Sequence, residues 1–150
     1  MYNLVIIDVQ TDFIDIVDNI NVIFKNINRN ILQANKDKAN IIFIEFPTER
    51  NKPSLICKEL DTSGKNVFIG KKQVMDASHQ VDRIIIKHSL NRSYFKVCGL
   101  YVEACVLATV DGLSNKFKQS QIEVLKDCCN QQNAENAFKL MRQNKNVTVS

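Results

Sequence analysis

The sequence predicts an α/β fold: a doubly wound, Rossmann-like parallel sheet of six strands in the order 3-2-1-4-5-6, with helices on both faces. Short apolar runs rich in β-branched residues recur along the chain, as is typical of strands buried on both faces of a sheet. Segments with apolar residues at helical spacing separate these runs. The length of 150 residues and the apolar content of 45% suit a single domain over residues 1–150.

Six segments have the character of buried strands. They are Leu4–Ile7, Ile41–Phe46, Val67–Ile69, Tyr94–Cys98, Ile122–Leu125 and Val147–Val149. Two amphipathic helices are predicted by apolar residues that recur every three or four positions. These residues are Ile20, Ile23, Phe24, Ile27 and Ile31 in the first helix, and Ala134, Ala137, Phe138 and Met141 in the second.

The segment from Val81 to Leu90 is ambiguous, because its apolar residues fit a helix while Ile84–Ile86 alone fits a strand. We interpret it as a helix, since a right-handed crossover must carry the chain from the third strand back to the fourth. The segment from Pro47 to Lys65 holds both prolines, so we expect a surface connection with little regular structure.

Composition narrows the class of protein. The formal charge is +4, from 20 basic and 16 acidic residues, and no run of like charge is longer than Lys71-Lys72. We therefore expect no nucleic-acid partner. No apolar stretch is long enough to span a membrane and no signal peptide is recognisable, so we expect a soluble cytoplasmic protein without a membrane partner.

The five cysteines are predicted to be reduced thiols, because a cytoplasmic chain with an odd count does not form a disulfide framework. Cys98 and Cys57 are expected to be packing residues. Cys128 and Cys129 are adjacent and poorly placed to bridge each other. The separated ligand pairs of a zinc site are missing, so no metal is expected.

Residues with chemically reactive side chains follow three of the predicted strands. Asp8 follows the first strand, Lys71 or Lys72 follows the third, and Cys105 lies six positions after Gly99, where the fourth strand breaks and a helix is expected to begin near Val102. In a doubly wound sheet such residues converge on one crevice at the carboxyl ends of the strands. With strands one and four adjacent, Asp8 and Cys105 should face each other.

Each of these residues also has an ordinary role: a turn aspartate, a solvated lysine or a buried cysteine. Their joint placement favours a site, because a thiol becomes nucleophilic beside a helix N-terminus, a cation or a base. Asp8 is a candidate proton acceptor. The two histidines, His79 and His88, are expected to be solvated surface residues rather than the base.

Three motifs then resemble those of the isochorismatase-like cysteine hydrolases, the superfamily that includes nicotinamidases, N-carbamoylsarcosine amidases and ureidoacrylate amidases. The motifs are Leu4-Val5-Ile6-Ile7-Asp8-Val9-Gln10-Thr11-Asp12-Phe13, Val67-Phe68-Ile69-Gly70-Lys71-Lys72, and Val97-Cys98-Gly99-Leu100 through Ala104-Cys105-Val106-Leu107-Ala108-Thr109. The similarity extends along essentially the whole chain.

The resemblance implies a catalytic triad. Asp8 would accept and return a proton, Cys105 would be the nucleophile, and Lys71 would be the cation that supports the thiolate. Successive strand side chains point to opposite faces, so only one of Lys71 and Lys72 faces the site. We choose Lys71 because it continues the strand more directly.

The resemblance also implies the surroundings of the nucleophile. The peptide bond between Leu100 and Tyr101 would be cis, and the backbone N–H groups of Tyr101 and Cys105 would form an oxyanion hole. Such donors are typically worth about 2.7 to 4 kcal/mol each in acyl transfer. Phe13 would line the substrate pocket, although packing against the first helix is an equally ordinary role.

Departures from the family pattern narrow the expected activity. Nicotinamidases carry histidine metal ligands after the second strand, where this chain has Glu45-Phe46-Pro47-Thr48, so neither a metal nor another cofactor is expected. True isochorismatases generally lack the nucleophilic cysteine, so Cys105 favours an amidase. The chain is shorter than is usual for the family, which suggests an open pocket or one completed by a partner subunit.

These observations predict a cysteine-dependent amidase that hydrolyses the C–N bond of a small amide or ureido substrate through a thioester. The alternative is a non-catalytic or regulatory relative that binds a small ligand or a partner subunit. A nucleotide-binding or receiver-like domain is disfavoured, because the chain has no Gly-x-Gly-x-x-Gly or P-loop motif. The resemblance further implies a homodimer or a larger homo-oligomer.

Overall fold

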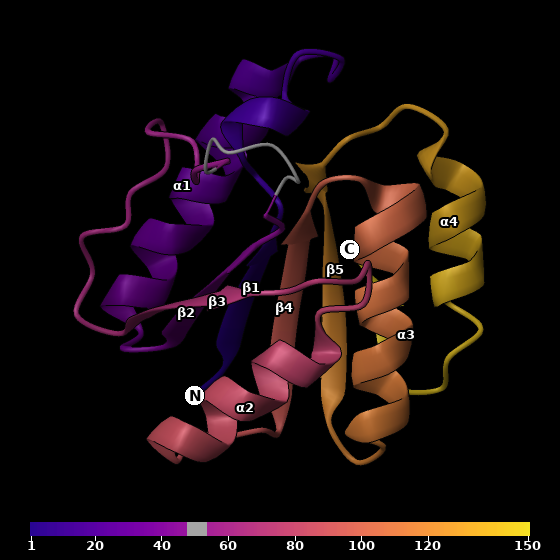
Figure 1. The fold of residues 1–150 in the computed structure, drawn as a ribbon. Helices are drawn as coiled ribbons and strands as arrows, with labels where there is room; N and C mark the ends of the chain where they lie inside the picture. Colours follow the sequence, from indigo (N-terminus) through magenta and orange to yellow (C-terminus); the bar gives the residue numbers. More distant parts are fainter. Residues whose placement is uncertain (48–53) are drawn as a thin grey trace.

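The computed structural model describes residues 1–47 and 54–150 (Figure 1). Six parallel strands form one sheet in the order β3-β2-β1-β4-β5-β6, which confirms the predicted order. Their bounds are β1 Asn3–Ile7, β2 Asn40–Glu45, β3 Val67–Lys71, β4 Tyr94–Gly99, β5 Gln121–Cys129 and β6 Val147–Val149. All six lie where the apolar runs predicted them.

Helices cover both faces of the sheet. They are η1 Thr11–Phe13, α1 Ile20–Lys36, α2 Ser78–His88, η2 Val102–Val106, α3 Leu107–Lys116 and α4 Ala134–Met141. Figure 1 shows α1 on one side of the sheet, with α2, α3 and α4 on the other. Contacts of α3 with both α2 and α4 join these three helices into one layer.

The buried residues explain these elements. Leu4 to Ile7 of β1 are at most 1% exposed, because the strand lies in the middle of the sheet with helices on both sides. One stripe of α1 packs on the sheet. Its buried members are Ile23, Phe24, Ile27, Ile31 and Ala34.

The ambiguous segment is helical. α2 runs from Ser78 to His88 and connects β3 with β4, as the crossover argument predicted. Between Ser54 and Lys65 the only pairing is an isolated bridge from Ile56 to Gln10, in agreement with an irregular connection. Residues 48–53 of that predicted connection lie outside the described residues.

Within the described ranges, none of the helices combines the length and the apolar character needed to cross a bilayer.

Candidate active site

β1 and β4 come into close contact at their carboxyl ends. Gly99, the last residue of β4, has a φ of +131°, and a Cβ at this position would lie 2.0 Å from the carbonyl oxygen of Ile7. Only glycine fits there. The next amide, that of Leu100, donates a hydrogen bond to the Ile7 oxygen at 2.9 Å. The segment that leads from β4 to Cys105 therefore begins in contact with Ile7, the residue before Asp8.

Asp8 stands immediately after β1. Its backbone N–H still bonds to the carbonyl oxygen of Ile44 in β2, and its φ of +52° turns the chain out of the sheet. An aspartate tolerates this left-handed conformation better than the β-branched residues of the strand do. The residue is only 2% exposed, so a carboxylate is held within the protein at this edge of the sheet.

The structure brings Lys72, and not the expected Lys71, to Asp8. The Nζ of Lys72 lies 2.8 Å from Oδ2 of Asp8, and the two side chains are 1% and 3% exposed. Lys71, the last residue of β3, is exposed. Strand alternation is the reason: Lys71 and the exposed Ile69 lie on one face, while Gly70 and Lys72 lie on the buried one.

Lys72 is fixed by three further contacts. Its backbone N–H bonds to the carbonyl oxygen of Glu45, which extends the pairing of β3 with β2 by one residue. Its ammonium donates a hydrogen bond to the carbonyl oxygen of Met75 at 2.7 Å. The same ammonium lies 5.1 Å from the centre of the Phe46 ring, within the range of a cation–π interaction. The cation is thus held facing Asp8.

Cys105 lies in a π-helical turn, not in the first turn of an α-helix as predicted. The N–H groups of Ala104 and Val106 both donate to the carbonyl oxygen of Tyr101, each at 3.1 Å. The bond from Val106 spans five residues, which widens the turn. The α-helix begins only at Leu107. The peptide bond between Leu100 and Tyr101 is cis, as the resemblance implied.

The thiol of Cys105 is half-buried beside both charged residues. Burial and the adjacent Asp8 carboxylate raise the pKa of the thiol to about 11, while Lys72 acts in the opposite direction. The thiol is therefore protonated at neutral pH. Cys105 becomes a nucleophile only when a neighbouring group takes its proton.

Asp8 is placed to take that proton. Burial raises the pKa of its carboxyl above the ordinary value of 3.8, and Lys72 and Cys105 oppose the rise. While Oδ2 pairs with Lys72, Oδ1 is buried and has no hydrogen-bond partner among the residues described. Hydrogen bonding with the nearby Cys105 thiol is one of the causes that lower the pKa of the Asp8 carboxyl, and Oδ1 keeps unused acceptor capacity.

Phe13 and Tyr101 form an aromatic pair next to the π-helical turn. Their ring centres are 6.3 Å apart at 66°, an edge-to-face arrangement. The Tyr101 hydroxyl also donates a hydrogen bond to the carbonyl oxygen of Phe13 at 2.5 Å. These contacts tie η1 to the residue that begins the cysteine turn, so Phe13 lies near the site and is only partly buried.

The analysis of the sequence missed Gln10, although its motif contains it. The side chain is completely buried: Oε1 accepts from the N–H of Phe46 at 2.6 Å, and Nε2 donates to the carbonyl oxygens of Phe46 and Ser54, each at 3.1 Å. Gln10 therefore fixes the backbone of the residue whose ring lies over Lys72. The available signal was its place between Asp8 and Phe13 in the first of the three motifs.

Thr109 was also missed, and it joins the lysine loop to α3. Its buried hydroxyl accepts a hydrogen bond from the N–H of Ala77 at 3.0 Å and lies 3.5 Å from the carbonyl oxygen of Met75. The Met75 oxygen is the one that holds the ammonium of Lys72. Thr109 lies in α3, about one helical turn after Cys105 in η2, so the helix that follows the Cys105 turn also supports the loop that holds Lys72.

Asn130, at the end of β5, holds the cysteine turn from the other side. Its Oδ1 accepts a hydrogen bond from the N–H of Val102 at 2.8 Å, and its Nδ2 donates to the Glu103 carboxylate at 3.2 Å. The residue is 2% exposed. No local sequence pattern predicts that Asn130 bonds to this turn, because the contact depends on the adjacency of β4 and β5.

The remaining thiols and both histidines lie apart from this chemistry. Cys57, Cys98, Cys128 and Cys129 are buried, whereas His79 and His88 are exposed. In the part of the chain that the structure describes, no group of three or more histidine, cysteine, aspartate or glutamate residues could hold a metal ion.

One protein family and several solved structures are similar to this chain. The family model described as Isochorismatase domain matches residues 2–150. No curated protein matches the chain. Among solved structures, the pyrazinamidase/nicotinamidase from Streptococcus mutans is similar with a TM-score of 0.80 and 18% identity, and the match covers 100% of both chains.

Two other solved structures have the same fold. N-carbamoylsarcosine amidase from Thermoplasma acidophilum has a TM-score of 0.83 at 14% identity, over 99% of this chain and 95% of that one. A pyrazinamidase of Pyrococcus horikoshii in complex with zinc has a TM-score of 0.80 at 17% identity, over 99% of this chain and 98% of that one. At these identities the likeness concerns the fold.

Proposed function

Because the chain belongs to the isochorismatase family, we propose that it is a cysteine-dependent amidase that hydrolyses the C–N bond of a small amide or ureido substrate. The observation that carries the proposal is the convergence of three side chains at the carboxyl edge of the sheet: the half-buried thiol of Cys105, the buried carboxylate of Asp8 and the ammonium of Lys72. Each supplies a different part of acyl-transfer chemistry.

The first half-reaction forms a thioester. Asp8 takes the proton of the Cys105 thiol on its free oxygen while the sulfur bonds to the substrate carbonyl carbon, and the carbonyl π electrons move onto oxygen. When the carbonyl re-forms, the C–N bond breaks, and the nitrogen takes the proton from Asp8 and leaves as ammonia or an amine. Lys72 keeps the carboxylate in place and favours the thiolate during the attack.

The second half-reaction reverses these roles. Water attacks the thioester carbon, Asp8 accepts a proton from the water, and the C–S bond breaks. The sulfur regains a proton from Asp8 and the acid leaves. Atoms and charge balance without a bound cofactor or an external oxidant.

The backbone N–H groups of Tyr101 and Cys105 are the proposed oxyanion donors. Both belong to the segment that wraps the π-helical turn, in which the Tyr101 carbonyl already accepts two hydrogen bonds. The fixed backbone supports this assignment, because preorganised donors need not rearrange as the oxyanion develops. Phe13 is the proposed wall of the substrate pocket, on the strength of its contact with the Tyr101 ring.

The test is ammonia release from a panel of small primary amides and ureido compounds. We expect turnover of at least one substrate, and a turnover rate about 10⁴-fold lower in Cys105→Ala. The mass spectrum of the wild-type enzyme, acid-quenched during turnover, should show a thioester adduct. Cys57→Ala, at a buried thiol outside the site, is the matched control and should retain activity. Full turnover by Cys105→Ala would overturn the proposed mechanism.

We also propose that the protein acts in the cytoplasm as a homodimer or a larger homo-oligomer. Apolar side chains exposed on and after β3 support an interface on that side of the site: Ile69 is 54% exposed, Val74 64% and Met75 54%. Light scattering coupled to size-exclusion chromatography measures the mass directly. A single species at 17.2 kDa would contradict the oligomer.

A further inference from the structure

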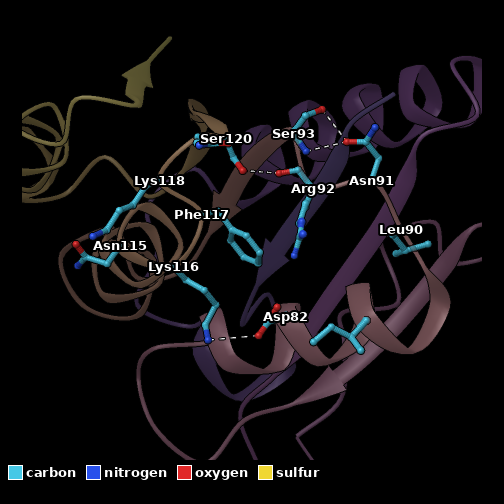
Figure 2. A pocket seen from close by; sticks show the side chains of 12 residues that line it. Asp82, Leu90, Asn91, Arg92, Ser93, Asn115, Lys116, Phe117, Lys118 and Ser120 are labelled. Atoms are coloured by element: carbon cyan, nitrogen blue, oxygen red, sulfur yellow. Dashed lines mark hydrogen bonds and ion pairs between the residues drawn. The ribbon is translucent and has the colours of Figure 1, made fainter.

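A hollow lies at the opposite edge of the sheet from Asp8, Lys72 and Cys105. It has a volume of about 970 Å³ and is formed by α2, the segment before β4, and the end of α3 with the turn that leads into β5 (Figure 2). The residues that precede β4 and β5 belong to the amino ends of these strands. None of the groups assigned to the amidase chemistry lines this hollow.

The lining of the hollow is positively charged. Three cations, Arg92, Lys116 and Lys118, and one carboxylate, that of Asp82, line it, and Asp82 lies 3.3 Å from the Lys116 ammonium. Figure 2 shows the Arg92 side chain pointing between Phe117 and Leu90 toward the Lys116–Asp82 pair, and the Lys118 side chain to one side, extending toward Asn115. Among the described residues, Arg92 and Lys118 form no ion pair. Two positive charges are therefore left without a counter-charge.

The backbone that carries Arg92 is held in place. Its carbonyl oxygen accepts a hydrogen bond from the Ser120 hydroxyl, and the carbonyl of Ser93 accepts one from the N–H of Gln121 at 2.9 Å. Asn146 donates to the Ser120 carbonyl at 2.9 Å. The cationic side of the hollow is thus built on fixed main chain, which lowers the entropic cost of binding.

The other side of the hollow is apolar. Ile86 of α2 is 67% exposed there, and Leu90 is partly exposed. Phe117 lies beneath, 7% exposed, with its ring 5.1 Å from that of Phe95. A cationic side and an apolar side together suit a ligand that has an anionic head and a small apolar body.

We propose that this hollow is a binding site for a small organic phosphate, separate from the amidase site. A phosphate monoester carries a charge of about −1.5 to −2 at neutral pH, which matches the two unpaired cations. The planar guanidinium of Arg92 binds two phosphate oxygens at once, and Lys118 adds a mobile point charge at the rim. The apolar part of the ligand rests against Ile86 and Leu90.

The probe is phenyl phosphate, titrated into the full chain by isothermal calorimetry. We expect saturable binding with a Kd below about 1 mM. Arg92→Gln should weaken it by about tenfold and Lys118→Gln by about threefold, because Arg92 reaches the centre of the hollow. Arg92→Lys, which keeps the charge but loses the planar fork, should lie between wild type and Arg92→Gln.

The controls separate this site from general electrostatics and from the active site. Arg83→Gln and Lys87→Gln remove exposed cations of α2 that do not line the hollow, and both should bind like wild type. Cys105→Ala should also bind like wild type. The proposal is overturned by equal weakening in the Arg83 or Lys87 variants, by loss of binding in Cys105→Ala, by equally tight binding of neutral benzyl alcohol, or by absence of saturation at about 10 mM phenyl phosphate. An acidic peptide that binds more tightly than phenyl phosphate would also overturn it.

Discussion

The ammonium of Lys72 and the carboxylate of Asp8 form an ion pair at 2.8 Å, with both side chains at most 3% exposed. A pair withdrawn from water to this degree is costly to bury and is not explained by stability alone. In the proposed mechanism this pair has a function beside the half-buried thiol: the cation holds the carboxylate that accepts the proton of Cys105.

Removing one member of the pair should destabilise the fold more than removing both. Asp8→Asn leaves the ammonium of Lys72 buried without its counter-charge, so we expect the free energy of unfolding to fall by about 3 kcal/mol. The double variant Asp8→Asn/Lys72→Met removes both charges and should recover most of that loss. Urea unfolding followed by circular dichroism gives the values for the wild type, Asp8→Asn, Lys72→Met and the double variant. A double variant as unstable as the sum of the two single variants would contradict this coupling.

The two adjacent lysines provide a matched comparison for activity. Lys72→Met should reduce kcat/KM by about 100-fold, since the carboxylate loses the cation that orients it. Lys71→Met removes the same charge from an exposed position one residue earlier and should change kcat/KM by less than about twofold. The reverse ranking would restore Lys71 as the residue of the site.

The error in the lysine has a physical origin in β3. This strand is the edge of the sheet, and Ile69 is 54% exposed while Gly70 is buried against Ile44 and Ile84. Lys71 does continue the strand directly, as expected, but it shares the exposed face with Ile69, whereas Lys72 follows Gly70 on the buried face. The central strands carried no such risk, because both of their faces are buried and their apolar runs predicted them correctly.

The π-helical turn and the supporting hydrogen bonds were not predictable in the same way. A turn with a bond across five residues uses the same residue types as an α-helix, so residues from Val102 onward predicted only a helix. Gln10 and Asn130 act through partners 36 and 28 positions away. Such partners become apparent only when the sheet brings β1, β2, β4 and β5 together.

The reactivity of Cys105 should depend on pH in a way set by its two charged neighbours. With the pKa of the thiol raised to about 11, its alkylation by iodoacetamide should accelerate up to about pH 11. Asp8→Asn should move the midpoint to lower pH, because that carboxylate raises the thiol pKa. Lys72→Met should move it to higher pH, because the ammonium lowers the thiol pKa.

Peptide mass mapping identifies the labelled thiol, and Cys105→Ala supplies the background. The other four cysteines are buried, so Cys105 should react first. A wild-type midpoint at or below the ordinary thiol value of 9.0 would show that the resting thiol is not held protonated.

Thr109 should contribute to stability through a single hydrogen bond. Thr109→Val keeps the shape of the side chain but leaves the buried N–H of Ala77 without its acceptor, at a cost of about 1 to 3 kcal/mol in the free energy of unfolding. Thr109→Ser keeps the hydroxyl and should cost less than Thr109→Val. Chemical denaturation ranks the two variants, and a larger loss in Thr109→Ser than in Thr109→Val would mean that the methyl group rather than the hydroxyl matters.

Gly99 should be the least replaceable glycine of the chain. In Gly99→Ala the new Cβ would lie 2.0 Å from the carbonyl oxygen of Ile7, at a φ of +131° that disfavours side chains. The clash is with the backbone of the central strand, so β1 and β4 must separate where Asp8 and the cysteine turn meet. We expect a loss of more than about 3 kcal/mol in the free energy of unfolding.

Gly64→Ala is the matched control for this substitution. Its Cβ would lie 2.5 Å from Oδ1 of Asn35, the end of a flexible and partly exposed side chain that can turn away. A cost below about 1 kcal/mol is therefore expected. Thermal and urea unfolding of the two variants compare a backbone clash with a side-chain clash directly. If Gly99→Ala unfolds at the same denaturant concentration as Gly64→Ala, the close approach of β4 to Ile7 does not determine the geometry of the site.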